Sequence, residues 1–381
     1  MTAQFLTISA VLLFSLANAA NGEAQPVPPP PPIAAKAYIL IDALSGRVLA
    51  EHHADERLEP ASLTKIMTAY LTFSELSSGK LHGDDMAPIS SKAASSGGSR
   101  MFAEVGSSVA VENLVKGMII QSGNDASIAL AERIAGDENA FADMMNRTAQ
   151  HLGMSNTHFA NSMGLPSPDH YSSARDMATL SRALISDYPD YYKWHSIKEF
   201  SYNNIKQPNR NLLLWQDPSV DGVKTGHTDG AGYCLVASAL RNKMRLISVV
   251  MGTRSDRERA SANAALLNYG FKYYETRPLY RANVKISEAH IWKGTESMTP
   301  VGIKRDFYVT FPQGQYDMLK ASMEVSNQSV APVQAGTRLG EVKVSLNNEI
   351  IAQQDLVALE TVGKGGLFKR LFDEIAMLIK K

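Results

Sequence analysis

The chain carries strand-like segments on both sides of a long helical segment, and this order constrains its fold more than any other feature. Residues 38–49 contain two apolar runs around a turn with a glycine, which predicts a β-hairpin. Between residues 111 and 185, apolar residues recur at helical spacing. Strand patterns follow at residues 200–202, 223–225, 234–237 and 245–250, with a helical pattern at 255–274. Because strands from both ends enclose helices, we expect one α/β domain over residues 36–278.

Beyond this domain the pattern changes to short alternating segments. They predict a small β domain over residues 279–362. An extension of the first sheet is the alternative. It is disfavoured because Arg277-Pro278 marks a natural boundary and no helix is interleaved among the later segments.

The C-terminal segment, residues 363–381, predicts an amphipathic helix. Its apolar stripe consists of Leu367, Phe368, Leu371, Phe372, Ile375, Leu378 and Ile379. The helix would be about 22 Å long, short of the roughly 30 Å hydrocarbon core of a bilayer. It can instead lie in the headgroup plane with its lysines toward anionic lipids. Docking of the stripe on the β domain is the alternative, but glycines at 363, 365 and 366 favour a hinge.

The N-terminal segment, residues 1–19, has the features of a secretory signal peptide. It contains one apolar run, carries no charged side chain and ends in Ala-Asn-Ala. An uncleaved anchor is the alternative, although the run is short for a bilayer span. Residues 20–35 predict a Pro-rich linker. We expect export in either case, and the single cysteine, Cys234, excludes an intrachain disulfide.

Charge and histidine spacing argue against several partners. Lys and Arg number 38, as do Asp and Glu, so the basic excess of nucleic-acid-binding proteins is missing. The sequence contains no His-Glu-x-x-His motif, and the pair His52-His53 is expected in an exposed turn. We therefore expect no nucleic acid, no metal and no cofactor.

Three short motifs occur in an informative order. Ser62-Leu63-Thr64-Lys65 opens a predicted helix, which places a hydroxyl and an amine on one face. Ser122-Gly123-Asn124 ends an apolar helical run, and Lys224-Thr225-Gly226 lies on a predicted strand. Ser-x-x-Lys alone is weak, since Ser77-Ser78-Gly79-Lys80 is a second instance. The order of the three motifs along the chain and their predicted structural context support the prediction more than any single motif does.

The residue types in these motifs favour acyl-enzyme chemistry. A serine hydroxyl needs a base, and no Gly-x-Ser-x-Gly elbow is present to support a histidine triad. We expect Lys65 to take the proton of Ser62. Lys224 is the expected second cation that lowers the pKa of Lys65.

The motifs with their flanks, residues 59–68, 120–126 and 220–228, resemble the type-5 penicillin-binding proteins, which are D-alanyl-D-alanine carboxypeptidases. The resemblance extends over nearly the whole chain. It implies a serine β-lactamase/transpeptidase-like catalytic domain with an antiparallel sheet and a helical insert. A small all-β sandwich domain and the amphipathic helix would follow.

The resemblance also implies an activity. The enzyme would remove the terminal D-alanine from peptidoglycan pentapeptide stems through an acyl-enzyme, and β-lactams would acylate it. Ser62, Lys65 and Ser122 would be catalytic, with Ser122 relaying a proton to the leaving D-alanine. The residues assigned to substrate binding are Asn124, Lys224, Thr225, Gly226, His227 and Arg210.

Within that assignment, backbone N–H groups of Ser62 and His227 would form the oxyanion hole. Arg210 would bind the substrate carboxylate, and a plain surface arginine is the alternative. The expected location is the periplasm, attached peripherally to the outer face of the inner membrane.

Two other functions stay open. A serine β-lactamase needs a glutamate that activates water, and Glu199 is the candidate. It is disfavoured because it lies on a predicted strand and Tyr202 stands where class A enzymes have leucine. A non-catalytic wall-binding scaffold would not need both Ser62 and Lys65.

Overall fold

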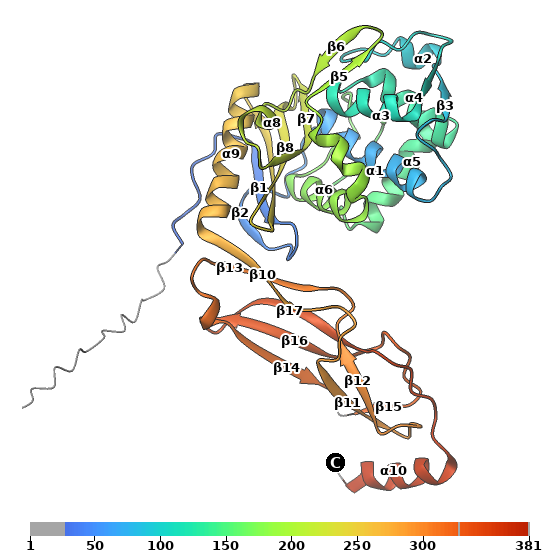
Figure 1. Ribbon diagram of the computed structural model, residues 1–381, viewed down its shortest axis with the longest axis vertical. Coiled ribbons are helices and arrows are strands. Elements are labelled where there is room, and N and C mark those ends of the chain that lie inside the picture. Colours follow the sequence, from blue (N-terminus) through green and yellow to red (C-terminus); the bar gives the residue numbers. More distant parts are fainter. Residues whose placement is uncertain (1–26, 327, 380–381) are drawn as a thin grey trace, which may run out of the picture.

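The computed structural model describes residues 27–326 and 328–379. The predicted signal peptide, residues 1–19, lies outside this part of the chain. An N-terminal region with helices around a sheet is followed by a β domain, and a single helix lies at the far end (Figure 1).

A five-stranded sheet forms the centre of the N-terminal region, in the order β2-β1-β9-β8-β7 with every neighbouring pair antiparallel. Its strands are β1 (Ala37–Asp42), β2 (Val48–His52), β7 (Val220–Thr228), β8 (Gly232–Arg241) and β9 (Met244–Thr253). The predicted hairpin and the predicted antiparallel sheet are therefore confirmed. Strand β7 is the last strand of the sheet, so one of its edges has no strand partner within the sheet.

Helices cover both faces of this sheet (Figure 1). On one face lie η1 (Ala61–Thr64), α1 (Lys65–Ser77), α2 (Ser91–Ala94), α3 (Val111–Lys116), η2 (Gly117–Gln121), α4 (Asn124–Ala135), α5 (Glu138–His151), α6 (Ala174–Asp187), α7 (Pro189–Tyr192) and η3 (Lys193–Ser196). Helix α9 (Asp256–Tyr273) covers the other face, and the short α8 (Leu213–Gln216) precedes β7. The predicted helical insert is confirmed.

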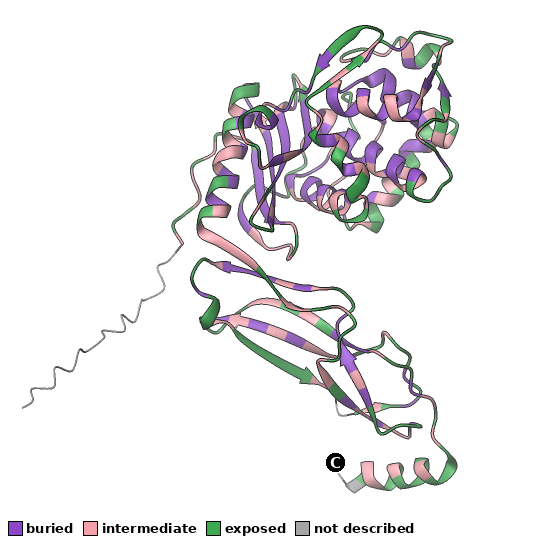
Figure 2. Ribbon diagram, viewed as in Figure 1, coloured by how far each residue is buried: buried purple, intermediate pink, exposed green. Residues whose placement is uncertain are grey.

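Alternation along the strands explains why the sheet is buried on both sides. Ile39 and Ile41 belong to the core beneath the helical insert, whereas Leu40 between them belongs to the core beneath α9. Successive side chains of a strand point to opposite faces, so each strand supplies both cores. Figure 2 shows these strands as the most continuously buried part of the molecule.

Two short two-stranded antiparallel sheets lie outside the central sheet. They are β3 (Met86–Pro88) with β4 (Ser108–Ala110), and β5 (Glu199–Tyr202) with β6 (Ile205–Pro208). The strand predicted at residues 200–202 is β5, and it pairs with β6 rather than with the sheet that carries β7.

The C-terminal part is the β domain that the sequence predicts. Its elements are β10 (Tyr274–Tyr280), β11 (Ser287–Trp292), β12 (Met298–Gly302), β13 (Phe307–Pro312), η4 (Tyr316–Met318), β14 (Lys320–Val325), β15 (Ser329–Val330), β16 (Arg338–Leu346) and β17 (Glu349–Ala358). Strands β10 and β13 form a ribbon beside a six-stranded sheet, and the two share an apolar core that includes Phe311, Val309 and Val344. Strand β10 begins directly after α9, so residue 278 lies inside a strand rather than in a linker.

Helix α10 (Leu367–Ile379) presents its apolar side chains to solvent. Leu367 is 80% and Phe368 is 82% exposed. Polar groups hold the helix to the β11–β12 turn: Lys293 pairs with Glu374, and the Lys293 amide donates to Asp373. The stripe is therefore not docked on the β domain.

Among the glycines before α10, Gly365 allows a close approach of two backbone segments. The amide of Gly365 donates to the Lys293 carbonyl at 2.8 Å, and a Cβ at Gly365 would lie 2.6 Å from the Gly294 oxygen. Within the described residues, no helix has both the length and the apolar content needed to cross a bilayer.

Asp42 joins the two parts of the molecule. This fully buried carboxylate accepts from the Ser45 amide at 2.7 Å and from Thr276 Oγ1 of β10 at 2.8 Å. Ser45 Oγ lies 2.6 Å from Thr310 Oγ1 of β13, and the Arg47 guanidinium donates to the Thr310 carbonyl. The β1–β2 turn is thereby bound to the β10–β13 ribbon.

We predict that Asp42→Ala lowers the free energy of unfolding by about 3 kcal/mol, because several partly buried donors lose their shared buried acceptor at once. Urea denaturation followed by circular dichroism measures the change. Asp84→Ala, at an exposed site, is the control and should stay within about 0.5 kcal/mol of the parent. A loss below about 1 kcal/mol for Asp42→Ala would contradict this role.

Candidate active site

The three sequence motifs meet at one groove of about 1130 Å³. The start of η1, the turn after η2 and strand β7 form its walls. Motif residues that line it are Ser62, Ser122, Asn124, Thr225, Gly226 and His227. Lys65 and Lys224 lie just beneath this surface, with 1% and 3% of their area exposed. The structure thus brings together residues more than 160 positions apart.

Ser62 and Lys65 face each other as predicted. Ser62 lies in the 3-10 turn η1 and Lys65 is the first residue of α1, so the three-residue spacing places them on one side. Lys65 Nζ lies 3.0 Å from Ser62 Oγ. The amine also donates to Asn124 Oδ1 at 2.7 Å and to the Met163 carbonyl at 2.6 Å. Three contacts therefore fix its position.

Burial lowers the pKa of Lys65 to about 7, and the charge of Arg210 acts in the same direction against the opposing effect of Asp125. The sequence indicated Lys224 as the cation acting on Lys65; Arg210, which it did not indicate for this role, lowers the pKa of Lys65 as well. The pKa of Lys224 is itself lowered well below its usual value by burial, and by Lys65 and Arg210. Near neutral pH, Lys65 is neutral in about half of the molecules.

Ser122 and Lys224 form a second hydroxyl–amine pair. Lys224 Nζ donates to Ser122 Oγ at 3.0 Å. Ser122 ends η2 with φ +66°, a left-handed conformation that is uncommon outside glycine and turns its hydroxyl into the groove. Asn124 begins α4 directly after this turn. Its side-chain Nδ2 donates to the Gly97 carbonyl at 2.6 Å.

Strand β7 passes close to the amide of Ser62 because Gly226 has no side chain. A Cβ at Gly226 would lie 3.0 Å from the Pro60 oxygen and 3.2 Å from the Ser62 nitrogen. The next residue, His227, is exposed to the groove and packs on Tyr233, with ring centroids 4.1 Å apart. The backbone of β7 is thus held beside the nucleophile's own amide, as an oxyanion hole requires.

Two arginines add positive charge to the groove. Arg210 lies exposed at its edge, and no described carboxylate lies within ion-pair distance of it. Arg259 of α9 also lines the groove, and its guanidinium donates to the Gly226 carbonyl at 3.0 Å. The sequence analysis missed Arg259, because nothing in the helical pattern of α9 distinguishes it from a surface arginine.

The small-residue loop before residue 103 forms the opposite wall. Gly98, Ser99, Arg100 and Phe102 line the groove. The carboxylate of Asp125 accepts from the backbone amides at positions 101, 102 and 103 at 2.9–3.1 Å, which fixes the loop on α4.

Glu199, the candidate of the β-lactamase alternative, lies on β5 and pairs with Lys206 at 2.8 Å. It is not among the groove residues. Among the described residues, no group of three or more His, Cys, Asp or Glu is arranged to hold a metal ion.

Comparisons with known proteins agree with this geometry. The family model of D-alanyl-D-alanine carboxypeptidases, peptidase S11, matches residues 23–255. The model of the penicillin-binding protein 5 C-terminal domain matches residues 274–364.

Curated relatives match over most of their length. The D-alanyl-D-alanine carboxypeptidase DacC of Escherichia coli strain K12 is 44% identical over 98% of this chain and 95% of its own. DacA of the same strain is 41% identical over 92% of this chain and 89% of its own.

The crystal structure of penicillin binding protein 5 from Haemophilus influenzae gives a TM-score of 0.84 at 42% identity, and the match covers 88% of this chain and 99% of that one. The family models, the curated relatives and the fold all indicate the same family. The chain belongs to the D-alanyl-D-alanine carboxypeptidases of the peptidase S11 family and carries the penicillin-binding protein 5 type of C-terminal domain.

Proposed function

We propose that this serine D-Ala-D-Ala carboxypeptidase removes the terminal D-alanine from peptidoglycan pentapeptide stems through an acyl-enzyme on Ser62. The observation that carries this assignment is the Lys65 amine, held 3.0 Å from Ser62 Oγ with a pKa of about 7. A lysine of ordinary pKa would be charged at neutral pH and could not act as a base.

In the acylation step, neutral Lys65 takes the proton of Ser62 as Oγ attacks the carbonyl carbon of the penultimate D-alanine. Backbone N–H groups of Ser62 and His227 stabilise the oxyanion. The peptide bond then breaks, and the proton taken up by Lys65 passes to the leaving D-alanine nitrogen through Ser122, whose hydroxyl is bonded to Lys224, so that Lys65 is neutral again. In deacylation, water attacks the ester carbon and Ser62 regains its proton, which releases the shortened stem.

The terminal carboxylate of the substrate would bind at the cationic side of the groove. Arg210 can offer two parallel N–H donors, and Thr225 adds a hydroxyl. Asn124 is placed to hold a substrate amide, and Gly226 leaves the free edge of β7 open to an extended peptide. This combination favours a peptide that ends in a free carboxylate.

β-Lactams would enter the same site. Their strained amide is attacked by Ser62, but the leaving nitrogen stays tethered to the acyl group and blocks the path of water. The solved relative from Haemophilus influenzae is itself a penicillin-binding protein.

We further propose a periplasmic location with peripheral attachment to the outer face of the inner membrane. The apolar side of α10 supports this, since Leu371, Phe372 and Leu378 are 62–71% exposed while polar groups on the other side contact the β domain. The export signal expected at residues 1–19 supports the compartment.

Incubation with benzylpenicillin and with a D-Ala-D-Ala peptide tests the assignment. We expect a persistent adduct on Ser62 by mass spectrometry and released D-alanine. Lys65→Arg should lower acylation by more than about a thousandfold, because guanidinium cannot act as a base. Lys224→Arg, the matched control, keeps an N–H donor beside Ser122 and should keep measurable acylation. Rapid penicillin turnover would favour a β-lactamase, no adduct would favour a scaffold, and equal loss in both variants would overturn the roles of the two lysines.

The acylation rate should depend on pH through Lys65. The base acts only when neutral, so the rate should rise as pH increases through about 7 and level off above. At pH 5 the rate should be about 1% of the plateau. Stopped-flow acylation by a fluorescent penicillin between pH 5 and 9 measures the profile. A flat profile below pH 7, with the fold intact by circular dichroism, would contradict this prediction.

Deletion of residues 367–381 should leave carboxypeptidase activity intact and abolish binding to anionic lipid vesicles. Co-sedimentation measures the bound fraction. Phe368→Asp in the full chain is a matched variant that places a charge on the apolar side, and it should also weaken binding. Unchanged sedimentation of both forms would refute attachment through α10.

A further inference from the structure

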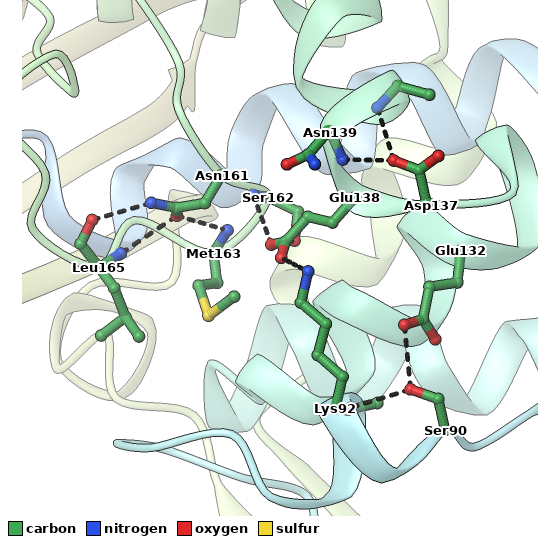
Figure 3. Close-up of polar contacts among 12 residues, drawn as sticks. Ser90, Lys92, Glu132, Asp137, Glu138, Asn139, Asn161, Ser162, Met163 and Leu165 are labelled. Atoms are coloured by element: carbon green, nitrogen blue, oxygen red, sulfur yellow. Dashed lines mark hydrogen bonds and ion pairs between the residues drawn. The ribbon is translucent and has the colours of Figure 1, made fainter.

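Glu138 is a buried carboxylate that lies outside the groove. It is the first residue of α5, and only 6% of its area is exposed. Asp137 caps the helix by accepting from the amides of Asn139 and Ala140, which fixes the position of Glu138 (Figure 3). Nothing in the mechanism above uses this group.

Glu138 connects two segments. Its Oε1 accepts from the amide of Ser162 at 3.1 Å and from Ser162 Oγ at 2.7 Å. Its Oε2 pairs with Lys92 of α2 at 2.8 Å (Figure 3). Burial alone would raise the pKa of Glu138, but the bonds from Lys92 and Ser162 outweigh it and hold the pKa below its usual value. The group is therefore a carboxylate at neutral pH.

One segment leads from Ser162 to the amine of Lys65. The next residue, Met163, accepts from Lys65 Nζ at 2.6 Å through its carbonyl. The Ser162 carbonyl accepts from Thr68 Oγ1, one turn along α1. Asn161 accepts from the amides that follow, which completes the turn. The carbonyl facing Lys65 is thus anchored by the residue bonded to Glu138.

The other segment leads from Lys92 to the same amine. The loop after α2 places the Gly97 carbonyl 2.6 Å from Asn124 Nδ2. Asn124 Oδ1 in turn accepts from Lys65 Nζ at 2.7 Å. The Met163 carbonyl therefore follows directly after the residue that is bonded to Glu138, whereas Asn124 of α4 only contacts the loop that follows the Lys92 helix.

We propose that Glu138 is a positioning residue of the reaction, which holds Lys65 toward Ser62 through the backbone of Ser162 and Met163. This inference rests on the proposed role of Lys65 as the base. Glu138 does not contact substrate. It acts by fixing the carbonyl that orients the amine, an arrangement in which a shift of about 1 Å can cost up to a hundredfold in rate.

The groups that face Lys65 set the sign of the expected pH effect. Asp125 of α4 raises its pKa, Arg210 lowers it, and Lys224 of β7 and His170 lie close by. The Met163 carbonyl stabilises the charged ammonium form. If the Met163 carbonyl is held less firmly, the pKa of Lys65 falls. The acid limb, the part of the pH profile in which the acylation rate rises, then moves to lower pH.

Glu138→Ala tests the proposal. We expect a plateau acylation rate about tenfold lower, with the acid limb shifted down by about half a pH unit. Glu138→Gln retains an acceptor for Ser162 and should stay within about threefold of the parent. If Glu138→Ala does not fold, Ser162→Ala removes one of the two bonds and should give a smaller change in the same directions.

Asp176→Ala is the matched control for stability. Asp176 is also buried, and it holds a loop by accepting from the amide of Asn156 and from Thr157 Oγ1, with no connection to Lys65. It should lower the melting temperature and leave the acid limb in place. An unmoved limb in Glu138→Ala and Ser162→Ala, or a Gln variant as slow as Ala, overturns the proposal. A parent that penicillin does not acylate refutes the function instead.

Discussion

Burial of the Lys65 amine is the constraint on which the rest of the site depends. Lys65 is 1% exposed, so its charged form loses almost all of its hydration. The carbonyl of Met163, the amide oxygen of Asn124 and the charge of Asp125 restore part of that loss. The result is a pKa of about 7, at which the amine can both accept and return a proton. Helix α1 supplies the lysine, while a loop and α4 supply what surrounds it.

Strand β7 supplies further groups to the same site. It carries Lys224 inward to Ser122 and presents an unpaired edge to the groove, and the bare backbone at Gly226 lets it approach Ser62. Rigid elements therefore position each reactive group: the start of a helix, the end of the π-helix η2 and the edge of a sheet. Because these elements are rigid, the reactive groups are already held close to the geometry that acyl transfer requires.

Local spacing made much of this predictable from sequence. A serine three residues before a lysine must share a helical face with it, and alternation along strands assigned the sheet and the β domain. Contacts between distant residues left no such pattern: Arg259 reaches Gly226 across 33 positions, and Glu138 meets Ser162 across 24. The same reason explains why the effect of Arg210 on Lys65 was not predicted and why the boundary at residue 278 fell inside β10.

The direct passage from α9 to β10 has a mechanical consequence. No residue separates the two elements, and Asp42 binds the turn above to the ribbon below. Strand β7, which lines the groove, and α10 lie toward opposite ends of the molecule (Figure 1). If α10 rests on a bilayer, as proposed above, a small tilt of the molecule there would move the groove near the opposite end through a longer arc.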